Sequence, residues 1–275
     1  MKKNYHFLLF PGFKEKAVTL SYDDAQRFDE RLVDIIVKNG FKATININSG
    51  LLGKLGYFTG SEAVDLYNKK YFEIAIHGVE HLSLPELSDV LKVKEIILDK
   101  IQLEGLFGQI IQGMAYANGA YDDDTIVVAE KCGIAYARTI ISTEDFSLPN
   151  NWMKMSTTCH HDNPRLKELI DSFLNDDKES YEWNRNPKLF SMWGHSHEFE
   201  KKNNWFVFED FARRMGNRDD IWYATNGEVY RYVKAFDALV YASSDKIIYN
   251  PSATDIYLRY FGKNVIIPAG ETIKL

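Results

Sequence analysis

The segment Ala17-Val18-Thr19-Leu20-Ser21-Tyr22-Asp23-Asp24 decides the fold of this 275-residue chain. Its first six residues form an apolar, β-rich run that is typical of a buried strand, and two carboxylates follow directly. In α/β proteins the carboxyl ends of parallel strands carry the chemistry. We therefore expect Asp23 and Asp24 to lie in a crevice at that edge of a sheet.

Similar apolar runs recur along the chain and alternate with helical patterns, which indicates βα units and a parallel sheet. We predict strands at 17–22, 42–47, 72–76, 113–117, 134–140, 152–157 and 188–194. We predict helices at 25–38, 61–69, 86–107, 122–132, 163–175 and 203–216, and a last strand and helix at 222–225 and 226–239. Right-handed crossovers then give an α/β fold, a distorted or incomplete (β/α) barrel of about seven parallel strands.

The C-terminal tail has a different character. Residues 246–275 are rich in Ile, Tyr and Val and are interrupted by Asn250-Pro251 and by Pro268-Ala269-Gly270, which predicts antiparallel strands joined by turns. The expected organisation is a barrel domain over residues 1–240 and a small β appendage, residues 241–275, packed on the barrel.

The charge balance narrows the class of partner. The chain has 33 basic and 39 acidic residues, which gives no overall attraction to nucleic acid or anionic membrane. No segment approaches the ~20 apolar residues of a membrane helix. The apolar run Phe7–Phe10 stops at Pro11-Gly12, which argues against a signal peptide, so we expect a cytoplasmic protein. Cys132 and Cys159 are interpreted as ordinary thiols.

Two histidines four residues apart, His77 and His81, follow the predicted strand 72–76. This spacing places both side chains on one face of a helical turn, as a shared metal ion requires. Asp24 can supply a third ligand and leave positions open for water and substrate, which is typical of a catalytic site. Asp23 would then be free to take a proton from the bound water.

The same residues also fit other interpretations. Acidic runs such as Asp122–Asp124 occur elsewhere in the chain, so Asp23-Asp24 is distinguished only by its position directly after a buried strand. Two histidines and one carboxylate also describe non-haem iron(II) oxygenases. Those enzymes use all-β scaffolds, whereas this chain alternates strand and helix.

Leu20–Ala25 resembles the Thr-Phe-Asp-Asp-Gly motif of the polysaccharide deacetylases, the NodB-homology or carbohydrate esterase family 4 enzymes. His77-Gly78-Val79-Glu80-His81 resembles their His-Ser/Thr-x-x-His motif, and Lys42–Asn46 stands where the family commonly has Ala-Thr-Phe-Phe. The order of the motifs also fits, with about 50 residues between the first and the second. The resemblance extends over about residues 15–235.

This resemblance implies specific roles. Asp24, His77 and His81 would bind a divalent metal, most often zinc, and Asp23 would be the catalytic base. The family's late motif places an acid histidine at a strand end, and His195 fits that description, with His197 as its competitor. The pair His160-His161 follows another strand and is interpreted as a loop pair without a metal role.

The third motif departs from the family pattern. In Met114–Tyr121, Ala115 stands where the family has an arginine that orients the base. We expect Arg138 to fill this role from the next strand; without it, catalysis would be impaired. The acidic residue that orients the acid histidine has no clear counterpart, and Asp145 and Glu198 are candidates.

The resemblance implies metal-dependent hydrolysis of an acetyl group. An N-acetyl group on an amino sugar is the expected substrate in preference to an O-acetyl group. Tyr116, Asn118, Tyr121 and Trp193 are candidates for substrate binding. The expected partner is a carbohydrate or a small acylated substrate, and homo-oligomerisation is left open. The alternatives are a hydrolase of a small amide or acylated metabolite, and a carbohydrate-binding relative without turnover.

Overall fold

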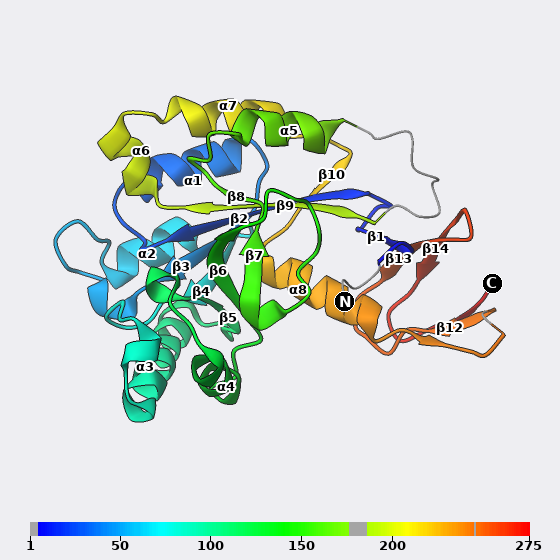
Figure 1. Cartoon of the computed structure of the whole chain (residues 1–275), viewed down its shortest axis with the longest axis horizontal. Coiled ribbons are helices and arrows are strands. Elements are labelled where there is room, and N and C mark those ends of the chain that lie inside the picture. Colours follow the sequence, from blue (N-terminus) through cyan, green and yellow to red (C-terminus); the bar gives the residue numbers. More distant parts are fainter. Residues whose placement is uncertain (1–4, 176–185, 245) are drawn as a thin grey trace.

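The computed structural model describes residues 5–175, 186–244 and 246–275. Its centre is a parallel sheet in the order β7-β6-β5-β4-β3-β2-β9-β8, with β10 paired to β2 (Figure 1). Helices surround the strands on the outside, so the prediction of a distorted (β/α) barrel is confirmed. The strands are β2 (Lys16–Asp23), β3 (Ala43–Ile47), β4 (Phe72–Ile76), β5 (Gly113–Ala115), β6 (Tyr136–Ser142), β7 (Met155–Thr157), β8 (Cys159–His160), β9 (Lys188–Gly194) and β10 (Ile221–Tyr223).

Strand β2 organises this sheet. All eight of its residues are buried, because helices cover one face and the barrel interior covers the other. It pairs with β9 along all but its last residue, from Lys16 opposite Lys188 to Tyr22 opposite Gly194. On the opposite edge, β10 pairs with its first residues and β3 with its last four. The carboxyl ends of β2, β3 and β9 therefore reach the same rim.

The helices lie close to their predicted positions. They are α1 (Asp29–Lys38), α2 (Gly60–Tyr67), α3 (Asp89–Phe107), α4 (Asp123–Lys131), α5 (Leu166–Leu174), α6 (Ser196–Lys202), α7 (Phe206–Met215) and α8 (Asn226–Asp237). Thr59 before α2 and Thr225 before α8 each form a capping box, in which side chain and backbone satisfy the amides of the first turn. In the described part of the chain, no helix is both long and apolar enough to cross a membrane.

Several predicted boundaries differ from the structure by two to four residues, and three of them have a clear cause. The first helix begins at Asp29 rather than at 25, because Asp24 and Ala25 adopt positive φ. The strand expected at 113–117 ends at Ala115, where a short 3₁₀ turn begins. Residues 152–154 form another 3₁₀ turn, so β7 begins only at Met155. Helix α6 was not predicted, since its seven residues are too few to show a clear period.

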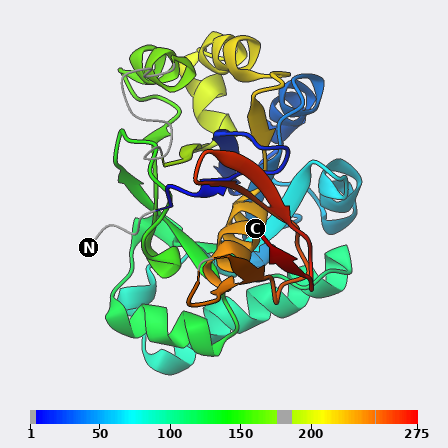
Figure 2. The same cartoon turned by 90° about the vertical axis from the view of Figure 1, so that its right-hand side faces the viewer.

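The tail forms the expected antiparallel strands, in two small sheets at the end of the molecule (Figure 2). One sheet joins β11 (Val240–Tyr241), β12 (Ile247–Tyr249) and β15 (Thr272–Lys274). The other joins β13 (Ile256–Tyr260) and β14 (Lys263–Ile267) to β1 (Leu8–Leu9). The pairing of β1 with β13 was not predicted, because two residues carry no periodic signal.

Candidate metal centre and active site

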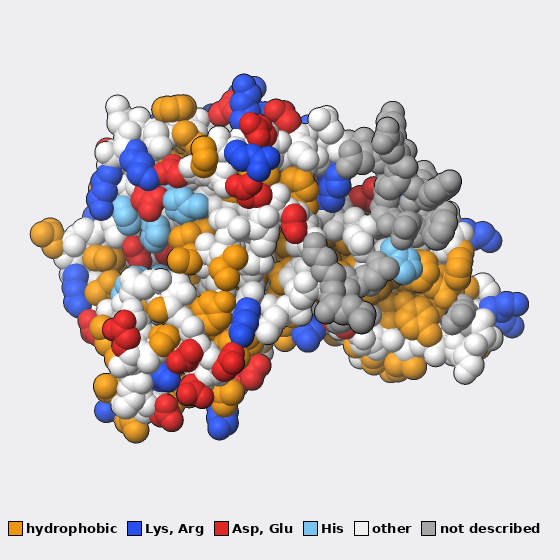
Figure 3. Space-filling view, viewed as in Figure 1, with side chains coloured by type: hydrophobic (Ala, Val, Ile, Leu, Met, Phe, Trp, Pro, Cys, Tyr) orange, Lys and Arg blue, Asp and Glu red, His pale blue; other side chains and the backbone are white. Residues whose placement is uncertain are grey.

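The acidic and histidine side chains expected at the site lie at the carboxyl ends of the parallel strands. Asp23 is the last residue of β2, His77 follows β4, and His195 follows β9. The space-filling view shows histidine side chains grouped with carboxylates on this side of the molecule (Figure 3). Three segments that are far apart in the sequence therefore form one site at the rim where α/β enzymes hold substrates.

Asp24, His77 and His81 come together as a set of potential metal ligands. Their ligand atoms all lie within 4.8 Å of one another. Oδ1 of Asp24 is 3.9 Å from Nε2 of His77 and 4.0 Å from Nε2 of His81. These separations are too long for hydrogen bonds, but they suit ligands that share one ion, because atoms each ~2 Å from zinc lie roughly 3 to 4 Å apart.

The hydrogen bonding of His77 fits metal binding. Its Nδ1 lies 2.8 Å from the carbonyl oxygen of Ala115, which can only accept, so Nδ1 carries the proton. Nε2 is left with a lone pair on the side of Asp24 and His81. Burial lowers the pKa of His77, which keeps the ring neutral as a ligand must be. Two nitrogens and one carboxylate are a donor set that zinc accepts, so these residues fit a divalent ion.

Two of the three candidate ligands have an unusual backbone. Asp24 has φ of 80° and His81 has φ of 60°, in the left-handed region that non-glycine residues seldom adopt. The backbone amide of Asp24 is held by the carbonyl of Asn46, at 3.0 Å. Such strain persists only where the surroundings enforce it, and it is concentrated at functional sites.

Asp23 is buried beside the candidate ligands and is held by a cation. Nη2 of Arg138 lies 2.6 Å from its Oδ1 and 2.5 Å from its Oδ2, and Nδ2 of Asn46 donates to Oδ1 at 2.8 Å. Asp23 is 3% and Arg138 is 1% exposed, so this is a buried ion pair with little solvent screening. The structure thus brings Arg138 to the carboxylate that the missing arginine at Ala115 would be expected to contact.

This pairing controls the ionisation of Asp23. Burial by itself would raise the pKa of the carboxyl, but Arg138, with smaller contributions from His77 and His195, outweighs burial, and the pKa lies below its ordinary value. The ionised carboxylate has one oxygen 3.7 Å from Nε2 of His195. A carboxylate and an imidazole therefore face the same space beside the candidate ion, as a base and an acid would.

His195 is held by Glu198, one turn further on in α6. Nδ1 of His195 and Oε1 of Glu198 are 3.2 Å apart, which directs Nε2 of the ring towards Asp23. Burial lowers the pKa of His195, but Glu198, Asp23 and Asp24 together raise it above its ordinary value. Of the two candidates for the orienting residue, Glu198 makes this contact. Asp145 instead accepts a hydrogen bond from the amide of Ser147, at 2.8 Å.

A second group of possible ligands comprises His160, His161, Asp162 and Glu198. Here the hydrogen bonding argues against a metal ion. Nδ1 of His160 accepts from the backbone amide of Asp162 at 3.2 Å, so Nε2 carries the proton and points to Glu198, 3.2 Å away. Nε2 of His161 lies 3.0 Å from the same carboxylate oxygen, an electrostatic contact without hydrogen-bond geometry. We therefore infer that His160 and His161 hold the side chain of Glu198 in place rather than bind a metal ion.

The expected substrate-binding residues lie in different surroundings. Tyr116 is buried, and its hydroxyl donates to the carbonyl of Met153 at 2.8 Å, so it is a core residue and the expectation that it contacts substrate is not supported. Tyr121 stacks on it at the half-buried rim. Asn118 is exposed, and its amide lies 3.4 Å from the carbonyl of His81 and 3.2 Å from Oγ of Ser83. Trp193 lies beneath the guanidinium of Arg138.

His197 is less well placed than His195 to act on substrate. Its Nδ1 is 4.0 Å from Oδ2 of Asp24, on the side of the carboxylate away from His77 and His81. Burial lowers its pKa and the charges of His195 and Lys201 lower it further, so the ring is neutral near pH 7 and poorly suited to donate a proton. The geometry therefore favours His195, the acid expected from the sequence, over His197.

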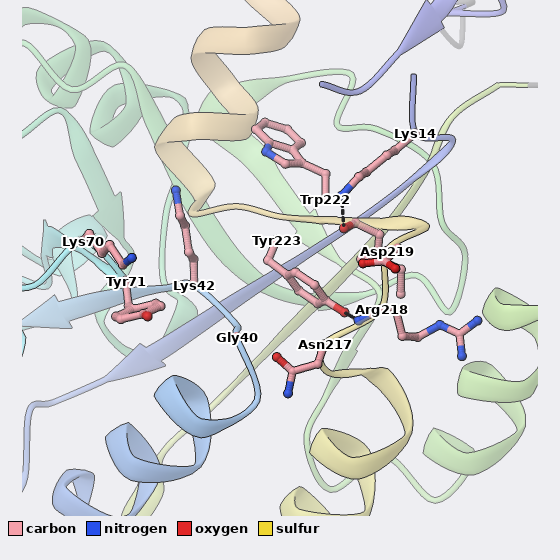
Figure 4. Close-up of a pocket in the computed structure, with 11 residues that line it drawn as sticks. Lys14, Gly40, Lys42, Lys70, Tyr71, Asn217, Arg218, Asp219, Trp222 and Tyr223 are labelled. Atoms are coloured by element: carbon pink, nitrogen blue, oxygen red, sulfur yellow. Dashed lines mark hydrogen bonds between the residues drawn. The ribbon is translucent and has the colours of Figure 1, made fainter. Parts of the chain in front are cut away.

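A separate hollow of about 530 Å³ lies at the opposite, amino ends of the strands (Figure 4). Cations line it, but their contacts are structural: Lys14 donates to the carbonyl of Ile221 at 3.0 Å, and Lys42 pairs with Glu228 at 2.5 Å. Helices α1 and α7 end beside it, and cations there offset the partial negative charge of helix C-termini. We assign this hollow no chemistry.

Comparisons with known proteins match the part of the chain that contains the candidate metal ligands. The sequence pattern of the polysaccharide deacetylases matches residues 11–137, which contain Asp23, Asp24, His77 and His81. Residues 11–137, a little under half of the chain, are therefore similar to the polysaccharide deacetylase family. Among curated proteins it is 26% identical over 120 residues to YxkH of Bacillus subtilis, which carries the name of a polysaccharide deacetylase. That match covers 43% of this chain and 43% of YxkH, so it spans less than half of either protein.

Solved structures support the fold of the chain. A structure from Mycobacterium smegmatis, also named for polysaccharide deacetylase, is 15% identical and has a TM-score of 0.62, covering 86% of this chain and 96% of its own. A carbohydrate esterase family 4 pseudoenzyme from Bacillus anthracis is 12% identical with a TM-score of 0.52, covering 82% of this chain and 68% of its own. At such identities the likeness concerns the fold alone.

Proposed function

We propose that the protein is a metal-dependent hydrolase that removes acetyl groups, most readily the N-acetyl group of an amino sugar. The observation that carries this proposal is the convergence of Asp24, His77 and His81 beside the ion pair of Asp23 and Arg138. Zinc is the ion that best fits two imidazoles and one carboxylate. When bound, it would lower the pKa of a coordinated water towards ~7 and polarise the acyl oxygen.

The residues of the chain would divide the proton transfers between them. Asp23 is ionised at neutral pH, because Arg138 holds its pKa low, and it would take a proton from the attacking water. His195 has a raised pKa and would give its Nε2 proton to the leaving amine. Water and the amide would thus yield acetate and a free amine, with one carboxylate and one imidazole as base and acid.

The rim of the site supports a carbohydrate substrate. Trp193 is half-buried, and its Nε1 lies in the interior without a hydrogen-bond partner in the described part of the chain. Its ring centroid is 5.8 Å from that of His195, so the exposed part of the ring can contact a sugar that is held near the acid. Asn118 and Tyr121 line the neighbouring loop and complete the proposed substrate contacts.

Hydrolysis is favoured over carbohydrate binding without turnover. Ala115 removes the arginine of the third motif, which on its own would suggest a relative without activity. Arg138 nevertheless contacts both oxygens of Asp23, and Glu198 contacts His195, so base and acid both have a partner. A protein that only binds carbohydrate would not need these two pairs.

We also propose that residues 1–240 form the deacetylase unit and residues 241–275 an appendage on it. The contact between them includes the pairing of β1 with β13, where Leu8 lies opposite Leu258. Because β1 comes from the N-terminus, the appendage would fasten the start of the chain to its end. Removal of residues 241–275 is expected to lower the melting temperature while leaving the site residues in place.

Acetate release tests the proposed activity. Purified protein would be incubated with N-acetylglucosamine oligomers, with acetylated xylan and with small acetamides, each with and without chelator. We expect chelator-sensitive release from the amino-sugar oligomers, and no release by Asp23→Asn with its metal retained. Release only from small acetamides would move the substrate to a metabolite. Full activity in chelator, or in Asp23→Asn, would contradict the mechanism.

A further inference from the structure

Helix α3 buries polar side chains as well as apolar ones on the face that it turns towards the protein. Lys92, Glu95 and Asp99 are buried beside Ile96, Leu103 and Phe107, while Val90 and Ile101 are 65% and 59% exposed. The buried face of an amphipathic helix is normally apolar, so the three polar residues are unusual there. Buried carboxylates are costly unless they accept hydrogen bonds, so the partners of Glu95 and Asp99 explain the arrangement.

Asp99 is fully buried and accepts two backbone amides. Its Oδ2 accepts from the amide of His77 at 3.0 Å, and its Oδ1 accepts from the amide of Ser49 at 2.7 Å. Such bonds to a carboxylate are stronger and shorter than those between neutral groups. One side chain of α3 therefore joins the first residue of the His77–His81 loop to the segment that follows β3.

Glu95 holds the middle of the same loop from one turn earlier in α3. Its Oε2 accepts from the amide of Glu80 at 3.0 Å, and its own carbonyl accepts from the amide of Val79 at 3.3 Å. Gly78, between these amides and His77, has φ of +83°, and a Cβ there would lie 3.1 Å from Oε2 of Glu95. The loop can approach this carboxylate closely only because residue 78 is glycine.

We propose that Asp99 and Glu95 are positioning residues, which hold the His77–His81 loop in the geometry that binds the divalent ion. The inference rests on the proposed function, because it requires an ion at Asp24, His77 and His81. Neither carboxylate is near enough to be counted among the ligand atoms of that group. They act through the backbone, which sets the direction of both imidazole rings.

The expected loss of metal affinity can be taken from other proteins in which a residue that hydrogen-bonds a metal ligand was replaced. Loss of such a partner typically weakens metal affinity by about 10- to 100-fold. The carboxamide of Asp99→Asn has one acceptor oxygen, so one of the two amides would face an N–H group. The amide of Ser49 would then lose its partner, whereas that of His77 would keep only its bond to the carbonyl of Ile47, at 3.0 Å. In Glu95→Gln the single side-chain bond to Glu80 can be kept by the remaining oxygen, so its effect should be smaller.

Zinc affinity of the full chain tests the proposal. The dissociation constant would be measured by competition with a chromophoric chelator for the wild type, Asp99→Asn, Glu95→Gln and Glu95→Ala. Glu104→Gln is the matched control, because Glu104 accepts the amide of Ile111 at 2.9 Å at the other end of the same helix. The visible spectrum of the cobalt form reports the ligand geometry independently of activity.

We expect weakening of about 10- to 100-fold in Asp99→Asn and at least several-fold in Glu95→Ala, with an altered cobalt spectrum. Glu104→Gln should keep the wild-type affinity and spectrum, even if its melting temperature falls. Wild-type affinity in folded Asp99→Asn and Glu95→Ala would overturn the proposal. If Asp99→Asn does not fold, Glu95→Ala alone decides. A wild type that binds no ion would instead remove the proposed function and this inference with it.

Discussion

Arg138 and Asp23 are 115 positions apart in the sequence, and Nη2 of the arginine contacts both oxygens of the aspartate in the protein interior. Arg138 extends from β6, the strand beside β5, whose Ala115 occupies the position of the family's arginine. Ala115 and Arg138 are direct partners in the register of these two strands. A guanidinium can therefore reach the same carboxylate from the neighbouring strand.

Replacement of Arg138 by alanine is expected to lower the rate by on the order of 100-fold while the metal is retained. The strongest group that opposes burial would then be absent and the pKa of Asp23 would rise, so the acidic limb of the pH–rate profile should move to higher pH. Arg138→Lys keeps the charge but not the planar fork, and an intermediate rate is expected. Steady-state rates across pH and metal analysis check this. An unchanged rate and profile in Arg138→Ala would show that the base is held otherwise.

Replacement of Glu198 by glutamine is expected to move the alkaline limb of the pH–rate profile to lower pH. The acid His195 must be protonated, so the rate falls as pH rises through its pKa. Burial lowers this pKa, and the bond to Glu198 is the largest of the effects that raise it. Without that charge, deprotonation should occur at lower pH. Asp145→Asn, which removes the other candidate, should leave the limb in place. A shift in Asp145→Asn alone would reverse the assignment.

Asp29 is predicted to destabilise the protein at neutral and alkaline pH. Burial raises the pKa of this carboxyl to about 7, and its Oδ2 accepts from Tyr67 at 2.6 Å. The unfolded chain loses the proton near its ordinary pKa of 3.8, so the folded state binds more protons between about pH 4 and 7. The free energy of unfolding therefore falls across this window as pH rises.

Asp29→Asn removes this titration and keeps an acceptor for Tyr67. The variant is expected to match the wild type near pH 4 and to exceed its free energy of unfolding by up to about 4 kcal/mol at pH 8. Urea unfolding of the metal-free proteins at both pH values checks the difference. Equal stability at pH 8, or a loss there, would mean that Asp29 is ionised in the folded protein and usefully paired.

Most of the fold could be predicted from the sequence because its elements have strong local patterns. The bounds of β4 and β9 agree with the prediction, since each is an apolar run between polar turns. Elements without a period could not be found in this way. The two residues of β1 and the two of β8 are strands only because β13 and β9 lie beside them.

The candidate site was predictable where residues follow strand ends, as Asp23, Asp24, His77 and His195 do. The supporting contacts were not, because they depend on which helix faces lie together in three dimensions. Nothing in the helical pattern distinguishes Asp99 and Glu95, yet both are buried against the histidine loop. Burial of Tyr116 was hidden for the same reason, since an aromatic residue near a strand end can face either the core or the rim.

The central claim is that Asp24, His77 and His81 bind one divalent ion, and the zinc content of purified variants tests it most directly. Elemental analysis after zinc supplementation and dialysis would compare the wild type with His81→Ala, and with His160→Ala as a control. The side chains of His81 and His160 are 30% and 23% exposed, so neither change should disturb the core. The account predicts about one zinc per chain in the wild type and in His160→Ala, and almost none in His81→Ala. No zinc in the wild type, or undiminished zinc in His81→Ala, would contradict it.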